Sequence, residues 1–169
     1  MKKISQDCFI NNKKEAGFTL LETIVATSVI VTALVSSLTL INSSLVLASN
    51  FGDRLVASNL AAEGIEVLRN IRDNNWLQTL SWNNGLSDGN YNVAYNSLSL
   101  TSFSDTPLKL NSLNGVYDYS SGSNQTVFKR KVSITNLSSY EIRIVSTVSW
   151  QRRSRAYSVA VEDHLFSWK

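Results

Sequence analysis

The chain has 169 residues, of which 43% are hydrophobic and 17% are charged. This is enough apolar material to bury one core, and too much for a disordered tail. The formal net charge of +3 is small, so a highly basic nucleic-acid-binding domain is not expected. Cys8 is the sole cysteine and His164 the sole histidine. This excludes an intramolecular disulfide, a zinc site built on cysteines and a two-histidine metal site, and we expect no cofactor.

The chain opens with a basic segment, residues 1–17, and continues into a long apolar run. Between Phe18 and Gly52 the only ionisable residue is Glu22. The run over residues 23–48 exceeds the ~20 residues that a helix needs to cross a ~30 Å hydrocarbon core, so we expect a transmembrane helix. A secretory signal peptide is the competing interpretation, but its apolar region spans only about 7–15 residues.

The charges that flank the apolar run predict its orientation. Four lysines precede it, and positively charged flanks remain in the cytoplasm. The sequence therefore predicts a single-pass protein of the cytoplasmic membrane, with a cytoplasmic N-terminus and a C-terminal region outside. The four residues are Lys2, Lys3, Lys13 and Lys14.

The junction between the basic segment and the apolar run reads KKEAGFTLLE, from Lys13 to Glu22. A basic leader ends in Gly17, Phe18 follows, and a glutamate is the fifth residue after the glycine. This closely resembles the N-terminal signature of type IV pilins and of type II secretion pseudopilins. The resemblance implies that a membrane-embedded prepilin peptidase cleaves after Gly17 and that Phe18 becomes N-methylated. It also implies an assembly role for Glu22, which would pair with the N-terminal amine of a neighbouring subunit.

The physical properties of these residues agree with those roles. Gly17 has no Cβ, so a protease can approach its backbone closely. A carboxylate inside a membrane helix costs about 2.5–3.5 kcal/mol at the bilayer centre, so Glu22 needs a partner. A new amine at Phe18 would lie four residues upstream on the same helical face. The alternative for Glu22 is a carboxylate that snorkels to the membrane surface and has no role.

The helix is expected to continue beyond the membrane. Apolar residues spaced by three and four form one stripe over residues 49–73, which is an amphipathic pattern, and Asn74 begins the punctuation that ends it. One helix is therefore expected from about Thr19 to about Asp73, with an apolar first half over residues 18–48. The stripe consists of Val56, Leu60, Gly64, Val67 and Ile71.

Residues 74–169 read as a globular β region. Three segments alternate apolar and polar residues, which indicates strands with one buried and one solvated face. Shorter strands are expected at Tyr91–Tyr95, Leu98–Leu100 and Val116–Tyr119. The sequence thus predicts an α+β, pilin-like fold, in which the long N-terminal helix packs on a C-terminal antiparallel β-sheet. The apolar positions of the three segments are Phe128, Val132 and Ile134; Ile142, Ile144, Val148 and Trp150; and Tyr157, Val159 and Val161.

No catalytic set is apparent in the sequence. It has no G-x-S-x-G motif and no glycine-rich phosphate loop, so we do not expect an enzyme. His164, close to Glu162 and Asp163, is interpreted as a surface histidine. Two basic clusters, Lys129–Lys131 and Arg152–Arg155, are candidates for DNA contact, and the alternative is a solvated sheet face or a subunit contact.

These features together predict a prepilin, a structural subunit of a type IV pilus, with a minor pilin ahead of a major one. The alternatives are a pseudopilin of a type II-like secretion system, a subunit of a DNA-uptake pilus, and a single-pass membrane-anchored binding module that never polymerises. The expected partners are prepilin peptidase, other pilin subunits, the cytoplasmic membrane and, in one alternative, DNA. After assembly the protein would lie in a cell-surface or periplasmic filament.

Overall fold

The computed structural model describes residues 17, 19–120, 122 and 124–168. The predicted leader over residues 1–16 and the predicted methylation site Phe18 lie outside the described residues. The chain divides into two compact units between Leu47 and Ala48, and each unit is considered by itself.

Within the described residues one helix comes first and eight strands follow. The elements are α1 (Leu20–Leu77), β1 (Gly89–Asn92), β2 (Thr101–Ser102), β3 (Lys109–Asn111), β4 (Val116–Asp118), β5 (Asn124–Gln125), β6 (Lys129–Ser138), β7 (Glu141–Arg152) and β8 (Arg155–Phe166).

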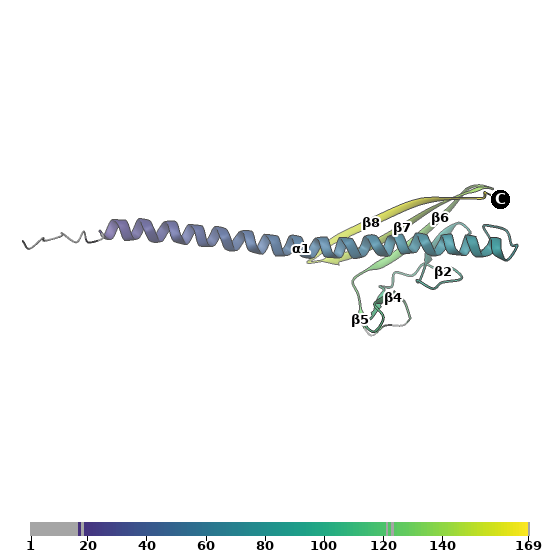
Figure 1. The fold of residues 1–169 in the computed structure, drawn as a ribbon, viewed down its shortest axis with the longest axis horizontal. Helices are drawn as coiled ribbons and strands as arrows, with labels where there is room; N and C mark the ends of the chain where they lie inside the picture. Colours follow the sequence, from purple (N-terminus) through teal and green to yellow (C-terminus); the bar gives the residue numbers. More distant parts are fainter. Residues whose placement is uncertain (1–16, 18, 121, 123, 169) are drawn as a thin grey trace, which may run out of the picture. The chain divides into compact units, whose positions relative to one another are not determined.

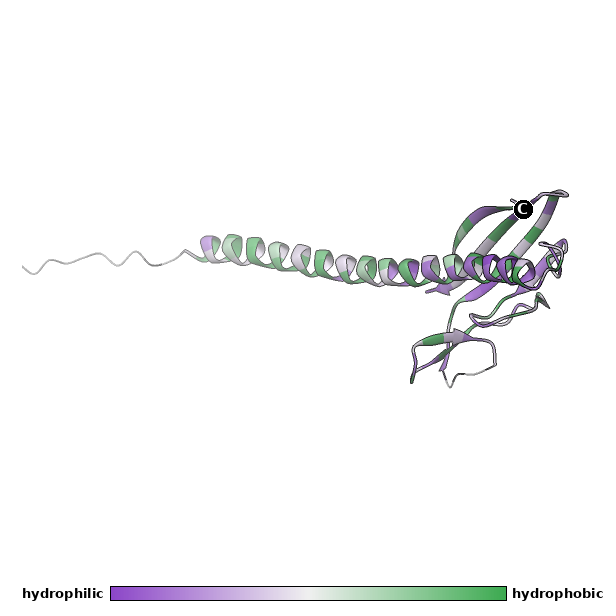
Figure 2. Ribbon diagram, turned by 45° about the vertical axis from the view of Figure 1, so that its right-hand side comes forward, coloured by the Kyte–Doolittle hydropathy of each residue, from purple (hydrophilic) through white to green (hydrophobic). Residues whose placement is uncertain are grey.

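The N-terminal unit contains the apolar part of α1. Every side chain from Leu20 to Leu45 is exposed, and neither glycine nor proline interrupts this stretch. Figure 2 shows hydrophobic colouring along most of it. By length and composition, α1 is long and apolar enough to cross a membrane, as the sequence predicts.

The C-terminal unit is built on an antiparallel sheet with the strand order β2-β1-β6-β7-β8. The part of α1 that follows Ala48 lies along one face of this sheet (Figure 1). The predicted α+β layout of one long helix packed on an antiparallel sheet is therefore confirmed. Of a second small sheet, β4-β3-β5, only the strand β4 was expected, because strands of two or three residues such as β5 and β3 leave no periodic pattern in the sequence.

The core lies between α1 and the inner face of the large sheet. At one end, Leu68 and Ile71 pack with the buried residues of β7, and at the other Leu60 packs with Phe128 and Trp150. The predicted stripe is confirmed at its four buried positions, whereas Val56 is half-buried. The flanking small and apolar residues of α1 are buried as deeply. The buried residues of α1 are Ala57, Leu60, Ala61, Gly64, Ile65, Val67, Leu68, Ile71 and Asn75.

Helix α1 ends one turn later than expected, at Leu77 instead of Asp73. The N–H of Thr79 donates to the carbonyl of Trp76 (3.1 Å), and the N–H of Leu80 donates to that of Asn75 (2.9 Å). Thr79 has a φ of 58°, so these bonds form a Schellman cap with a threonine where glycine is usual. The missing glycine explains why the sequence did not indicate this end.

The three long strands appear where the alternating pattern predicts them. Every predicted inward position of β7 is buried, and Ser146 joins them on the same face. The strand expected at Tyr91–Tyr95 is shifted to β1, and Leu98–Leu100 is not a strand, since β2 begins directly after it. The strand expected at Val116–Tyr119 appears as β4, one residue shorter.

Candidate functional site

The segment that carries the predicted cleavage and assembly residues is solvent-exposed. Gly17 lies before α1, and a Cβ added to it would meet nothing within 4 Å. Thr19 then caps the helix, because its Oγ1 accepts a hydrogen bond from the N–H of Glu22 (3.2 Å) and its carbonyl accepts one from the N–H of Thr23 (3.2 Å). The structure therefore brings Thr19 and Glu22 together.

The capping role of Thr19 is a feature that the sequence interpretation missed. The spacing T-x-x-E, here from Thr19 to Glu22, is the sequence signature of a capping box at a helix N-terminus. A carboxylate in the first turn also interacts favourably with the helix dipole. Glu22 thus has a local role in starting the helix, in addition to any role in pairing with an amine. Phe18, which would supply that amine, lies outside the described residues.

The exposed apolar surface of α1 is far larger than a soluble monomer normally presents. Apart from half-buried Val46, its large side chains are between 54% and 77% exposed from Leu20 to Leu47. A surface of this kind is suited to contact with lipid or with other apolar helices. Its large members are Leu20, Leu21, Ile24, Val25, Val29, Ile30, Val31, Leu34, Val35, Leu38, Leu40, Ile41, Leu45 and Leu47.

The hydroxyl groups within this apolar segment are satisfied by the helix itself. Each serine and threonine from Thr23 to Ser44 donates a hydrogen bond to a backbone carbonyl three or four residues earlier. Such back-bonding removes the cost of an unpaired hydroxyl in a hydrocarbon environment. The serines and threonines are therefore compatible with a membrane-spanning segment.

Arg130 does not belong to a solvated basic cluster. Its side chain is fully buried (0% exposed), because it shares the inner face of β6 with Val132. Nη1 donates to the carbonyl of Leu60 (2.9 Å) and to Glu63 Oε1 (3.0 Å), and Nη2 donates to the carbonyl of Val93. The interpretation of residues 129–131 as one solvated cluster is therefore wrong for Arg130, which links β6 to α1.

The second basic cluster is also divided. Arg152 makes a two-point ion pair with Asp53 of α1, with Nε–Oδ2 and Nη2–Oδ1 distances of 2.7 and 2.8 Å. Arg153 and Arg155 are exposed at the β7–β8 turn. A third link joins Arg69 of α1 to Asp163. Polar contacts thus hold α1 against the inner face of the sheet at several points along its length.

His164 lies between two carboxylates on the outer sheet face. Its Nδ1 is 2.8 Å from Glu141 Oε1, and its Nε2 is 3.4 Å from Glu162 Oε1. The hydrogen bond with Glu141 raises the pKa of His164 above its ordinary value, the contact with Glu162 adds to this, and partial desolvation opposes it. In the part of the chain that the structure describes, no group of three or more His, Cys, Asp and Glu residues is placed to hold a metal ion.

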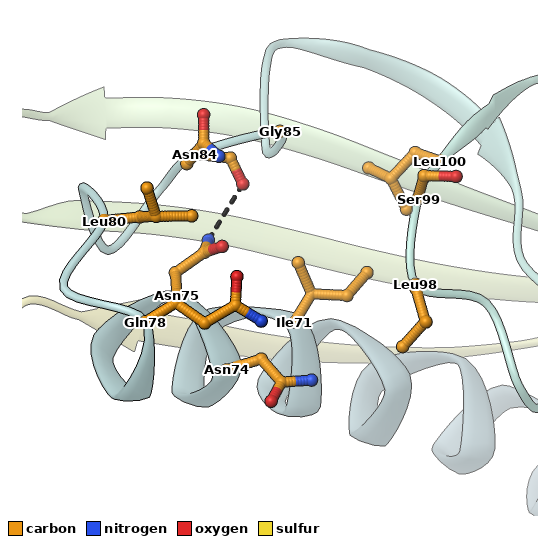
Figure 3. Close-up of a pocket in the computed structure, with 10 residues that line it drawn as sticks. All are labelled: Ile71, Asn74, Asn75, Gln78, Leu80, Asn84, Gly85, Leu98, Ser99 and Leu100. Carbon is orange, nitrogen blue, oxygen red and sulfur yellow. Dashed lines mark hydrogen bonds between the residues drawn. The ribbon is translucent and has the colours of Figure 1, made fainter.

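A groove of about 490 Å³ lies beside the C-terminal end of α1. Figure 3 shows that Asn75 reaches across its base, where Nδ2 donates to the carbonyl of Asn84 (2.8 Å). Apolar side chains such as Ile71 and Leu98 line the rest. No lining residue is ionisable, so the groove offers no general acid, base or charged nucleophile.

No protein-family model, curated protein or solved structure matches the chain.

Proposed function

We propose that the chain is a prepilin, a minor-pilin subunit of a type IV pilus that is cleaved after Gly17, N-methylated at Phe18 and assembled into a helical filament. One observation carries the proposal: the apolar part of α1 exposes every side chain from Leu20 to Leu45 and bears a lone carboxylate, Glu22, in its first turn. The exposed apolar surface does not suit a protein that stays in water, and together the two features suit a helix that moves from lipid into a bundle of like helices.

The proposed sequence of events begins at the N-terminal end of this segment. Prepilin peptidase removes the basic leader at the accessible Gly17, which leaves an amine on Phe18. The carboxylate of Glu22 then pairs with the amine of a neighbouring subunit, since a carboxylate among apolar helices needs a cationic partner. Thr19 keeps the first turn of α1 folded, so Glu22 is presented from a rigid element. The apolar side chains of α1 would form the filament core.

The C-terminal unit has a core of its own, to which the apolar segment contributes no residue, and this supports the proposal. Its core is closed by α1 and the sheet, and ion pairs such as Arg152–Asp53 and Arg130–Glu63 fix the helix to the strands. It therefore needs no contact with the apolar segment to be folded, and it would be displayed on the outside of the filament.

Three alternative functions would also use the apolar part of α1 as a membrane anchor. A pseudopilin or a DNA-uptake subunit would share every processing step, and deletion of the gene followed by assays of motility, secretion and DNA uptake separates them. Exposed Arg153 and Arg155 are the residues on which DNA contact would depend. A membrane-anchored binding module that does not polymerise differs, because it predicts that the charge of Glu22 is dispensable.

The test is intact-mass and N-terminal peptide analysis of the protein purified from its own cells. We expect a chain that begins at N-methylated Phe18. Gly17→Arg should leave the full-length precursor in the membrane, because a long cationic side chain blocks close approach of the peptidase, whereas Gly17→Ala should retain more processing. A chain that still begins at Met1 in cells with active prepilin peptidase would contradict the proposal.

A further inference from the structure

Strand β8 forms one edge of the large sheet. Within the described residues it pairs with β7 alone, along its entire length from Arg155 to Phe166. The edge at the other side of the sheet is formed by β2, which is only two residues long. The sheet therefore has one short edge and one long one, and Figure 1 shows β8 running as the outermost of the three long strands.

The β7–β8 turn determines which backbone groups of β8 point to the open side. The loop consists of Arg153 and Ser154, with φ values of 46° and 64°, which is the type I′ geometry of a two-residue hairpin. In such a hairpin the flanking residues, Arg152 and Arg155, form a hydrogen-bonded pair. Every second residue from Arg155 then bonds to β7, and the intervening residues direct N–H and C=O to the open side. These are Ala156, Ser158, Ala160, Glu162, His164 and Phe166.

The central part of the open edge of β8 lacks the features that normally prevent strands from pairing at an edge. Proteins protect such edges with short strands, lysine, proline, β-bulges or inward-pointing charges, and the inward-pointing charge of β8, Asp163, lies near its C-terminal end, where it pairs with Arg69 of α1. β8 has 12 residues, without proline or lysine, and its register with β7 is unbroken. The neighbouring β6–β7 ladder, by contrast, has a register shift between Asn136 and Ser138. The centre of β8, Ala156–Val161, is also uncharged. An unprotected edge of this length is suited to accept another strand.

The charges of β8 indicate which strand fits. Arg153 and Arg155 lie at its start, and Glu162 and Asp163 lie near its end. A strand of the same sequence that runs antiparallel places its acidic end beside these arginines and its basic end beside these carboxylates. A parallel copy would place like charges together, which is unfavourable. The edge is therefore complementary to itself in one direction only.

We propose that β8 pairs antiparallel with β8 of a second copy, so that the sheet continues across a two-fold axis. Isologous pairing of this kind is the commonest way in which identical chains associate. The inner-face residues Tyr157, Val159 and Val161 are half-buried in the single chain, and the second copy would cover them. The contact uses residues of the C-terminal unit only.

The first test is the mass of the full chain in detergent, measured by sedimentation over a range of concentrations. We expect a dimer that dissociates on dilution. Ala160→Pro removes an N–H that points to the open edge, not to β7, and should weaken the dimer at least tenfold. Ala160→Val is the matched control, because it keeps the N–H and should leave the dimer unchanged. Thermal unfolding of both variants establishes that the sheet is intact.

The second test reverses charges. Arg155→Glu and Asp163→Arg should each weaken the dimer about tenfold, because residues 155 and 163 lie on the same face of β8 and would be opposite each other, so each variant places like charges at both ends of the contact. Thermal unfolding of Asp163→Arg measures separately what the loss of the Arg69–Asp163 ion pair costs the single chain. An equimolar mixture of the two variants should dimerise as the unmodified chain does, since every contact in the mixed pair again joins opposite charges. Restoration in the mixture requires a contact between two copies.

Two results would overturn the proposal. One is a monomer at every concentration. The other is a dimer that neither Ala160→Pro nor the charge reversals weaken, which would place association in the apolar part of α1 instead. Cleavage after Gly17 and the effect of Glu22 variants are measured separately, so failure of the edge contact would be distinguishable from failure of the proposed function.

Discussion

Gly64 of α1 and Ser146 of β7 lie so close together that a Cβ on Gly64 would be 2.6 Å from Ser146 Oγ. The same Cβ would be 3.2 Å from Arg130 Cδ and 3.3 Å from Val132 Cγ2. Both Gly64 and Ser146 are buried. Gly64 is thus the point at which the helix backbone approaches the sheet too closely for any side chain.

This relationship predicts opposite effects for the same substitution at two positions of one helix. Gly64→Ala should lower the free energy of unfolding of the C-terminal unit by about 1–3 kcal/mol through overpacking. Gly52→Ala, where the new Cβ meets nothing within 4 Å, should raise helix stability by about 0.5–1 kcal/mol. Denaturant titration followed by tryptophan fluorescence measures both. Ser146→Ala should recover part of the loss in the Gly64→Ala background, and equal effects at the two glycines would contradict the close approach.

A second prediction concerns the buried ion pair between Arg130 and Glu63. Glu63→Gln should lower the free energy of unfolding by about 2–4 kcal/mol, because it leaves a buried cation without its counter-charge. The lower end applies, since the Glu63 side chain is 33% exposed. Arg130→Met removes the cation and should recover much of the loss in the Glu63→Gln background. A double-mutant cycle by denaturant titration measures this coupling, and additive effects would show that the pair does not act as a unit.

A third prediction is a pH dependence of stability on the outer sheet face. Since Glu141 raises the pKa of His164, the stabilisation is complete below the unfolded value of about 6.5 and is lost as pH rises through the folded pKa. Glu162, 3.4 Å from His164 Nε2, and Arg143, opposite His164 in the β7–β8 ladder, are the other charges nearby. The thermal midpoint of the unmodified chain should therefore fall more between about pH 6 and pH 8.5 than that of His164→Asn. If the thermal midpoint depends on pH in the same way in both proteins, the His164–Glu141 pair is not the cause of the dependence.

A fourth prediction separates the charge of Glu22 from the cap at Thr19. Glu22→Val and Glu22→Gln both remove the charge and keep the backbone N–H that Thr19 caps, whereas Thr19→Ala removes the cap and keeps the charge, at a cost of about 0.5–2 kcal/mol of helix stability. If the charge of Glu22 drives assembly, Glu22→Val and Glu22→Gln should each reduce filament yield strongly, and Thr19→Ala should reduce it little. All three should still be cleaved after Gly17. The yield of sheared filaments measures assembly, and normal yield from Glu22→Gln would exclude the pairing role.

The elements that could be predicted from the sequence are those with a long, regular pattern. Helix α1 and strands β6 to β8 repeat their apolar residues often enough for the period to identify them. The small sheet around Lys109–Asn111 and the cap at Thr79 could not be found in this way, because each depends on contacts with distant residues and not on a local repeat. Element ends were accordingly the least accurate part of the prediction.

Arg130 shows a different limit. Because Arg130 lies between two lysines in the sequence, it was grouped with them as a basic cluster. Its position in the alternating pattern of β6 instead places it on the inner face with Val132 and Ile134. The alternation, applied to every residue of the strand and not only to the apolar ones, would have indicated that this arginine is buried. Its partner Glu63 lies 67 residues away in sequence, and no local pattern identifies such a pair. At the N-terminus, by contrast, the T-x-x-E spacing from Thr19 to Glu22 was readable and was overlooked.

The hydroxyl groups that bond back to the backbone of α1 have a consequence for how the segment tolerates its surroundings. Because each hydroxyl from Thr23 to Ser44 has its acceptor within the same helix, none of them depends on a particular neighbour. The segment can exchange one apolar environment for another without breaking or forming a hydroxyl hydrogen bond, so these hydroxyls add nothing to the difference in free energy between the two, which packing and the carboxylate of Glu22 set. Its serines and threonines therefore favour neither of two apolar environments over the other, and small changes in packing can contribute to which one it occupies.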